Sequence, residues 1–284
     1  MRIGITGANG LFGSGLTMVA GERHEAVPLT RAQADLTDLQ QVDRALRPLH
    51  LDVVIHAAAD PDPDDCELHP EAAFRANVVS TANLMRTARE LKFDVALIST
   101  DAVFDGTKSS PYVETDPPNP ISVYGRTKLA AEHEVQKSDR HWIFRVSVLF
   151  GPGRPGKPNF IDKGLRKIQN GETYVVASDQ VGSAAYTLDI AAKILAAIAE
   201  ERYGLYHLSN AGQCSRLQLA QAAAKLVGLD SSKVIGRPMA EMQRPGPRPK
   251  YTEMEMRALS EAGFKIPRPW QDALADYLAR YWKN

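Results

Sequence analysis

Tyr124 and Lys128 lie four residues apart in the segment YGRTK, a spacing that suits proton transfer. Residues i and i+4 of a helix project from the same face, so the phenol and the ammonium would be neighbours. A free tyrosine has a pKa near ~10, which is too high for ready proton exchange at neutral pH. Because a nearby ammonium stabilises the phenolate, we expect Lys128 to lower the pKa of Tyr124 toward the range of a working general acid.

A glycine-rich turn near the N-terminus, TGANGLFG, predicts a dinucleotide site. Its glycines separate an expected strand at 2–6 from an expected helix at 11–20. Gly7 permits a tight turn, Gly10 lets the backbone approach a pyrophosphate, and Gly13 lets the helix pack closely on the sheet. The N–H groups at the start of the helix would face the phosphates. The alternative is a structural turn in some other α/β protein.

The end of the second expected strand, HEAVPLT at 24–30, bears on the choice of cofactor. The dinucleotide-binding pattern has an acidic residue here that holds the ribose 2′-hydroxyl of NAD. Arg31 stands in that region instead, and an arginine pairs well with a 2′-phosphate. We therefore expect NADP(H) to be preferred. Asp35 lies close enough in sequence that NAD(H) stays a possible cofactor. Leu36 is expected to lie at the edge of the adenine. The alternative is that Arg31 is a solvated loop residue with no part in cofactor choice.

Small polar residues follow the apolar run DVALI in the segment STDAVFDG. Such a run is typical of a buried strand, and Ser99, Thr100 and Asp101 come at its carboxyl end. That end of a parallel sheet opens on the crevice where ligands bind. We expect the Thr100 hydroxyl to align a substrate carbonyl beside Tyr124, and Lys128 to hydrogen-bond the ribose of the nicotinamide.

These groups need a scaffold, and strand-like and helix-like segments alternate through the first half of the chain. The further segments are strands at 52–59, 94–99 and 141–150 and helices at 38–47, 70–91 and 120–137. The alternation predicts an α/β fold, a Rossmann-type doubly wound parallel sheet with helices on both faces and right-handed crossovers.

A Pro/Gly-rich loop, GPGRPGKPN at 151–159, predicts a domain boundary. We expect residues 1–150 to form the dinucleotide-binding domain, to which later segments return. Residues 151–284 would form mainly a smaller C-terminal α/β lobe that binds substrate. A second proline-rich loop at 236–250 carries basic residues suited to a diphosphate, the alternative being a solvated connector. These are Arg237, Arg244, Arg248 and Lys250, of which Arg244 is the preferred candidate.

The bulk composition argues against several classes of partner. Lys plus Arg equals Asp plus Glu at 34 each, so we expect no binding to nucleic acid or to an acidic membrane. No apolar stretch approaches the ~18 residues of a membrane span, and the first residues form a strand and turn rather than a signal peptide. Cys66 and Cys214 lack a CxxC pattern, which fits a reducing compartment, the cytoplasm. We expect no metal, and a solvated turn at DPDPDD, 60–65.

Together these segments resemble the extended short-chain dehydrogenase/reductase family, and within it the dTDP-4-dehydrorhamnose reductase branch. The similarity spans nearly the whole chain, and STDAVFDG followed by YGRTK is its most specific part. The resemblance implies reduction by NAD(P)H of a 4-keto group on a deoxysugar nucleotide, with Tyr124 protonating the alkoxide. It also implies a catalytic group of Thr100, Tyr124 and Lys128, and a homodimer.

The same resemblance implies two sets of binding residues. Those lining the cofactor would be Gly7, Asn9, Gly10, Leu11, Ala57, Ala58, Ala59, Asn77 and Ser99. Those touching the substrate would be Asp101, Val103, Phe104, Asn159 and Arg244.

Four departures from the family pattern fall on the expected substrate side. Ala102 replaces a usual tyrosine, Val148 replaces a tryptophan or other bulky residue, and Ala184 and Ala185 replace Pro-Thr. DPDPDDCE stands where the family often has a threonine and VDxxE. The changes are explained either by a different or bulkier substrate or by neutral drift.

Two other functions stay open. A sugar-nucleotide epimerase or dehydratase shares the tyrosine and lysine but recycles its nicotinamide internally. A non-catalytic NADP-binding regulatory subunit, like the beta subunit of methionine adenosyltransferase, also retains both residues.

Overall fold

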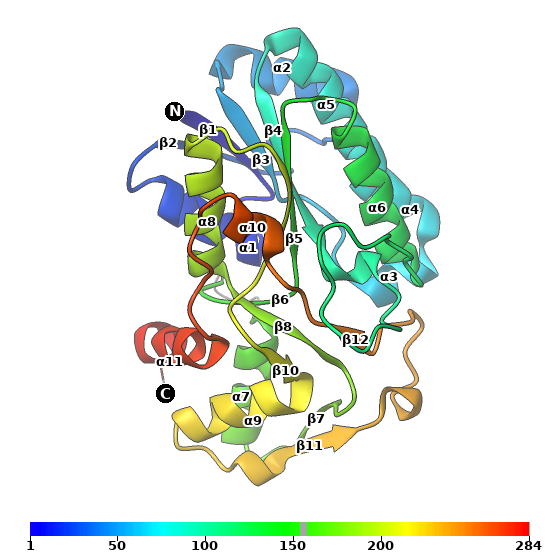
Figure 1. Ribbon diagram of the computed structural model, residues 1–284, viewed down its shortest axis with the longest axis vertical. Coiled ribbons are helices and arrows are strands. Elements are labelled where there is room, and N and C mark those ends of the chain that lie inside the picture. Colours follow the sequence, from blue (N-terminus) through cyan, green and yellow to red (C-terminus); the bar gives the residue numbers. More distant parts are fainter. Residues whose placement is uncertain (154–157, 284) are drawn as a thin grey trace.

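The computed structural model describes residues 1–153 and 158–283, so residues 154–157 of the Pro/Gly loop expected at 151–159 lie outside the described part. Its main sheet has the spatial order β2–β1–β3–β4–β5–β9, with every pairing parallel (Figure 1). The strands are β1 (Arg2–Thr6), β2 (Glu25–Leu29), β3 (Val53–His56), β4 (Asp94–Thr100), β5 (His141–Val146) and β9 (Gly204–Leu208). The order reverses between β1 and β3, which places a crevice at the carboxyl ends of these two strands. The predicted Rossmann-type fold is confirmed.

Helices cover both faces of the sheet (Figure 1). One face carries α1 (Leu11–Ala20), α8 (Thr187–Ala199) and α10 (Arg257–Glu261), and the other carries α2 (Leu39–Leu46), α5 (Ser80–Leu91) and α6 (Val123–Val135). Side chains alternate along β4, so Ala96 and Ile98 pack toward α1 and α8 while Val95 and Leu97 pack toward α5 and α6. Ser99 therefore points toward the α6 side.

The helix expected at 70–91 is interrupted. After α3 (Pro63–Leu68) come α4 (Pro70–Phe74), a π-helical turn (Arg75–Val79) and then α5. Such turns widen a helix locally and are frequent at functional sites. Here the turn contains Asn77.

The strand expected at 141–150 is also divided, because the chain leaves the main sheet at Ser147. Beyond it, β6 (Val148–Phe150) pairs with β8 (Val181–Tyr186) of the smaller lobe. The Ser147 hydroxyl donates to Asp101 Oδ2 at 2.6 Å, which fixes the crossing point beside the end of β4.

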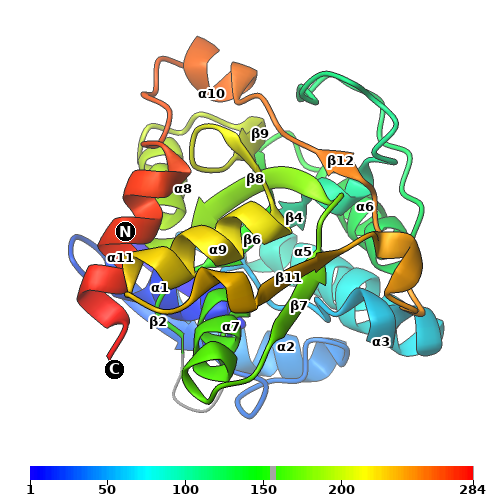
Figure 2. The ribbon, with the colours of Figure 1, turned by 90° about the horizontal axis from the view of Figure 1, so that it is seen from below.

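The smaller lobe has its own core around Phe150, Tyr186 and Tyr277. Its remaining elements are α7 (Phe160–Gln169), β7 (Tyr174–Ala177), β10 (Gln213–Ser215), α9 (Arg216–Leu226), β11 (Val234–Arg237), β12 (Tyr251–Thr252) and α11 (Trp270–Tyr281). Short 3-10 turns occupy Arg47–Leu49, Asp101–Val103, Ser231–Lys233 and Met239–Glu241. Figure 2 looks onto this lobe, with α9 in front of β6 and β8. Both α8 and β9 belong to the main sheet's domain although they follow the lobe's first strands.

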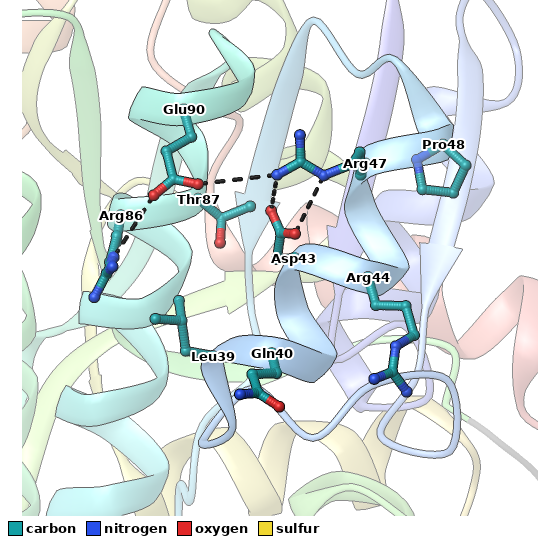
Figure 3. Close-up of a pocket in the computed structure, with 9 residues that line it drawn as sticks. All are labelled: Leu39, Gln40, Asp43, Arg44, Arg47, Pro48, Arg86, Thr87 and Glu90. Carbon is teal, nitrogen blue, oxygen red and sulfur yellow. Dashed lines mark hydrogen bonds and ion pairs between the residues drawn. The ribbon is translucent and has the colours of Figure 1, made fainter.

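An open hollow of about 680 Å³ lies between α2 and α5 on the outer surface (Figure 3). Four of its five charged groups pair with one another, as in Arg47 with Asp43 and Arg86 with Glu90. It includes none of the residues expected to bind ligands. Among the helices of 1–153 and 158–283, none is long and apolar enough to cross a membrane.

Candidate active site

Tyr124 lies in the first turn of α6, whose start is fixed on several sides. The Ser122 side chain caps the helix by accepting from Gly125 N at 3.1 Å, and Glu67 Oε2 accepts from Val123 N at 3.0 Å. Gly125 lets the helix touch the turn after β4, since an added Cβ would clash with the carbonyl oxygen of Ala102. These contacts hold Tyr124 beside the end of β4.

The phenol of Tyr124 is half-buried and lies within hydrogen-bond reach of the Thr100 side chain. Burial raises its pKa, and Asp101, Cys66 and Asp60 raise it further, while the hydrogen bond with Thr100 acts in the opposite sense. The expectation that the neighbouring ammonium would lower this pKa is therefore wrong, because burial disfavours the phenolate more strongly. The phenol holds its proton firmly at neutral pH.

Lys128 lies one turn further along α6 and is 3% exposed. Its Nζ donates to the carbonyl oxygen of Ile98, on β4, at 2.7 Å. Burial lowers the pKa of Lys128 to about 8, while Glu132 acts to raise it. The ammonium thus lies beneath the same strand end that carries Thr100.

Asp101 ties the two lobes together at this point. Its Oδ2 accepts from Ser147 Oγ at 2.6 Å and from Thr252 Oγ1 at 2.7 Å, and its Oδ1 accepts from Thr100 Oγ1 at 3.1 Å. Three hydroxyls from three segments therefore orient one half-buried carboxylate next to Tyr124.

The glycine-rich turn has the geometry of a dinucleotide cradle. Gly7 has a φ of 64°, and a Cβ on it would lie 2.8 Å from the backbone of Ala58. A Cβ on Gly13 would clash with the carbonyl oxygen of Gly7. Among the described residues no side chain caps the N-terminus of α1, and its first turn has no acidic residue, so its N–H groups can accept a phosphate as partner. Exposed or half-buried residues around this turn are Asn9, Gly10, Leu11, Ala57, Ala58 and Ala59.

Arg31 follows β2 with its side chain 90% exposed. Its Nη2 lies 4.0 Å from Asp35 Oδ2, a distance at which the guanidinium stays available to another anion. The other oxygen of Asp35 accepts from Thr37 N at 3.0 Å, a bond that lowers the pKa of that carboxyl. Leu36 is half-buried against the core under α2 and α5.

Asn77 and Ser99 are fully buried and support the cleft from behind. Asn77 Oδ1 accepts from Asp60 N at 2.7 Å, and its Nδ2 donates to Thr127 Oγ1 at 2.9 Å, which joins the loop after β3 to α6. The Ser99 hydroxyl donates to Glu132. Their polar atoms are thus engaged within the protein.

Three residues expected to touch substrate have their side chains in packed interiors. Val103 and Phe104 are 0% exposed, and the Phe104 ring stacks on Tyr112 with centroids 4.1 Å apart. Asn159 caps α7, accepting from Ile161 N at 2.8 Å, and donates to Tyr277 Oη at 2.8 Å. The side chains of these three residues thus pack within the protein, and their contact with substrate stays a prediction.

Arg216 is a residue of the site that the sequence did not single out. It begins α9 and lies 5.6 Å over the Phe160 ring, half-buried. Burial lowers its pKa, Asp101 opposes that effect, and Arg244 adds to it, so two guanidiniums lie in one region. Neither arginine has an ion pair with any residue in the described ranges, and Asp101 and Asp64 act on Arg216 and Arg244 only from a longer distance. A cation at a helix N-terminus opposes the helix dipole, and that unfavourable position was the available signal.

The loop at 236–250 is fixed to α3 by Arg248 rather than Arg244. Arg248 Nη1 pairs with Asp64 Oδ1 at 2.5 Å, and Gly246 N donates to the same oxygen at 3.0 Å. Arg237 and Lys250 are exposed. Nowhere in 1–153 or 158–283 do three or more His, Cys, Asp or Glu residues form a cluster that could hold a metal ion.

The parallel sheet, the glycine cradle and the Thr100–Tyr124–Lys128 arrangement define an extended short-chain dehydrogenase/reductase. The family model described as "RmlD substrate binding domain" matches residues 1–283, and the chain belongs to this family. It is 34% identical over 284 residues to dTDP-4-dehydrorhamnose reductase of Mycolicibacterium smegmatis, covering 98% of this chain and 85% of that protein.

Two solved structures are closely similar. A dTDP-4-dehydrorhamnose reductase from Clostridium acetobutylicum superposes with a TM-score of 0.93 at 33% identity, covering 98% of this chain and 99% of the other. The Bacillus anthracis enzyme of the same name, in complex with NADP, gives a TM-score of 0.93 at 29% identity, covering 98% of each chain.

Proposed function

We propose that this protein reduces the 4-keto group of a dTDP-linked 6-deoxysugar with NADPH, as dTDP-4-dehydrorhamnose reductases do. The observation that carries the proposal is the meeting of Thr100, Tyr124 and Lys128 at the carboxyl end of β4, beside the glycine cradle. Near-complete coverage by reductases of that name supports the choice of substrate class. We also propose a cytoplasmic location and a homodimer.

The residues present fit a dinucleotide. The backbone of Gly7 and Gly10 and the open N-terminus of α1 would hold the pyrophosphate, and Arg31 would pair with a 2′-phosphate. Ala57, Ala58 and Ala59 would border the cofactor where their small side chains leave room. When bound, the nicotinamide supplies the hydride.

Tyr124 acts as the general acid. A phenol with a raised pKa stays protonated at neutral pH, and an alkoxide is a far stronger base, so the proton moves from Tyr124 to the sugar oxygen. The Thr100 hydroxyl, which donates to Asp101 in the free protein, would turn to donate to the same oxygen and orient it. Lys128 provides the positive charge that stabilises the phenolate left behind.

The smaller lobe would bind the nucleotide. Arg216 and Arg244 bring two positive charges to one side of the cleft, and neither forms an ion pair with a carboxylate of the described residues, which suits a diphosphate. The Ser147 and Thr252 hydroxyls hold Asp101 through Oδ2, so Oδ1 is in place to contact the sugar.

The test is to mix the purified protein with NADPH and dTDP-4-dehydrorhamnose and to follow absorbance at 340 nm together with the sugar product. We expect one NADPH oxidised per sugar reduced, with NADH used less well. An epimerase would convert sugar without consuming NADPH and would retain bound NAD. A regulatory subunit would bind NADPH without turnover. Either result would contradict the proposal.

A further inference from the structure

A buried pair of opposite charges lies behind Lys128 and has no part in the reaction as described so far. Glu132 on α6 and Arg145 on β5 have side chains 1% and 3% exposed. Arg145 Nε donates to Glu132 Oε1 at 3.0 Å, and Nη2 donates to Oε2 at 2.7 Å. A carboxylate that accepts a hydrogen bond through each of its oxygens from one guanidinium is held in a single orientation.

The same carboxylate connects α6 to the strand that ends at the site. Ser99 Oγ donates to Glu132 Oε1. Ser99 stands between Ile98, whose carbonyl binds Lys128, and Thr100. Consecutive residues of β4 thus contact the lysine and the glutamate of α6, and the next residue is the catalytic threonine.

We propose that Glu132 is a positioning residue for Tyr124 and Lys128, because its carboxylate, fixed by Arg145 and Ser99, is the counter-charge of the buried ammonium. Glu132 lies one helical turn beyond Lys128, on the same face of α6. This inference rests on the proposed function, since it assigns a role in the same proton transfer.

The other groups around Lys128 do not supply that counter-charge. His56 faces it from β3, but burial and Lys128 lower the pKa of this imidazole to about 3, so it is neutral. Tyr124 on α6 is protonated, and Arg145 on β5 is itself a cation. Glu132 is the carboxylate whose charge favours the protonated amine.

The test compares Glu132→Gln with Glu134→Gln as a matched control. Glu134 lies on the same helix but is 25% exposed and pairs with Lys137 at the surface. Glu132 raises the pKa of Lys128, so Glu132→Gln should lower that pKa by about one unit. If the reaction requires charged Lys128, the pH above which kcat decreases should fall by the same amount. At pH 8 the charged fraction then drops from about a half to about a tenth, and kcat falls about fivefold. Glu134→Gln is expected to match the wild type.

An NMR titration measures the pKa of Lys128 directly and does not require catalytic turnover. In protein labelled with ¹³Cε-lysine, the Lys128 signal is assigned by its loss in Lys128→Met. We expect it to titrate near pH 8 in the wild type and at lower pH in Glu132→Gln. Glu132→Asp keeps the charge, so we expect it to retain the wild-type pH profile even if its stability is reduced.

The outcomes separate the possible failures. Glu132→Gln could be less stable or slower and still show the wild-type pKa of Lys128 and the wild-type pH dependence of kcat. In that case the role of Glu132 is structural, and the inference is overturned. If the wild type and Glu134→Gln both lack reductase activity, the proposed function fails, while the lysine titration still decides the role of Glu132.

Discussion

Replacing Arg248 with methionine should loosen the contact between the two lobes beside the site. Arg248 is 13% exposed and Asp64 is 34% exposed, with Nη1 and Oδ1 2.5 Å apart. A hydrogen bond to a charged group contributes about 1.5–3 kcal/mol when buried, and an exposed ion pair contributes about 0.2–1 kcal/mol. Because Asp64 is about a third exposed, and keeps its bond from Gly246 N, we expect unfolding to become easier by about 1–2 kcal/mol.

The pH dependence of this loss follows from the pKa of Asp64. The hydrogen bond from Arg248 lowers that pKa in the folded protein, and burial opposes the shift. A depressed folded pKa stabilises the fold above the unfolded value of about 3.9 and loses its effect as pH falls through the folded value. The difference in free energy of unfolding between wild type and Arg248→Met should therefore be at its maximum at pH 7 and should decrease below pH ~4.

Urea unfolding followed by tryptophan fluorescence measures this difference, with Arg257→Met as the control. Arg257 is 50% exposed and pairs with Glu255 at 3.3 Å on the surface, so its loss should cost less than about 0.5 kcal/mol. The loop that Arg248 anchors also carries Arg244, so the KM for the nucleotide sugar should rise while the Kd for NADPH stays constant. Equal losses in the two variants, or a difference that does not narrow in acid, would refute this reasoning.

Three further substitutions test single groups. Tyr124→Phe removes the general acid, so kcat should fall about 10²–10⁴-fold while the Kd for NADPH, measured by fluorescence titration, changes only a few-fold. Arg31→Met removes the cation expected at the 2′-phosphate, so the KM for NADPH should rise at least about tenfold while that for NADH stays the same. Arg216→Met should raise the KM for the sugar nucleotide, and dTDP binding measured by calorimetry should weaken in parallel. An unchanged value in any of these assays removes that residue from its assigned role.

Local sequence patterns were sufficient for most of the Rossmann domain. The turn at Gly7, the helix at 11–20 and the strand before Thr100 each follow from short-range spacing, and the structure has all three. The pair Tyr124 and Lys128 shares one helical face for the same reason. These features depend on residues close together in the chain.

Local sequence patterns could not predict features that depend on contacts between residues far apart in the chain. The apolar run 141–150 looks continuous, yet it divides at Ser147, where the hydroxyl meets Asp101 from a different strand. The sequence predicts that Phe104 touches the substrate, but it does not reveal that the Phe104 ring stacks on Tyr112. The direction of the pKa shift of Tyr124 likewise depends on how deeply the fold buries it.

The most direct test of the account is to follow a labelled hydride. The protein is incubated with NADPH carrying deuterium on the transferable position of the nicotinamide C4 and with dTDP-4-dehydrorhamnose, and the sugar product is examined by mass spectrometry and NMR. We predict a single deuterium, located on C4 of the sugar, in wild-type product, and at least about 10²-fold slower incorporation with Tyr124→Phe. Sugar product free of deuterium, or equal rates for the two proteins, would contradict the assignment of Tyr124 as the acid in a hydride reduction.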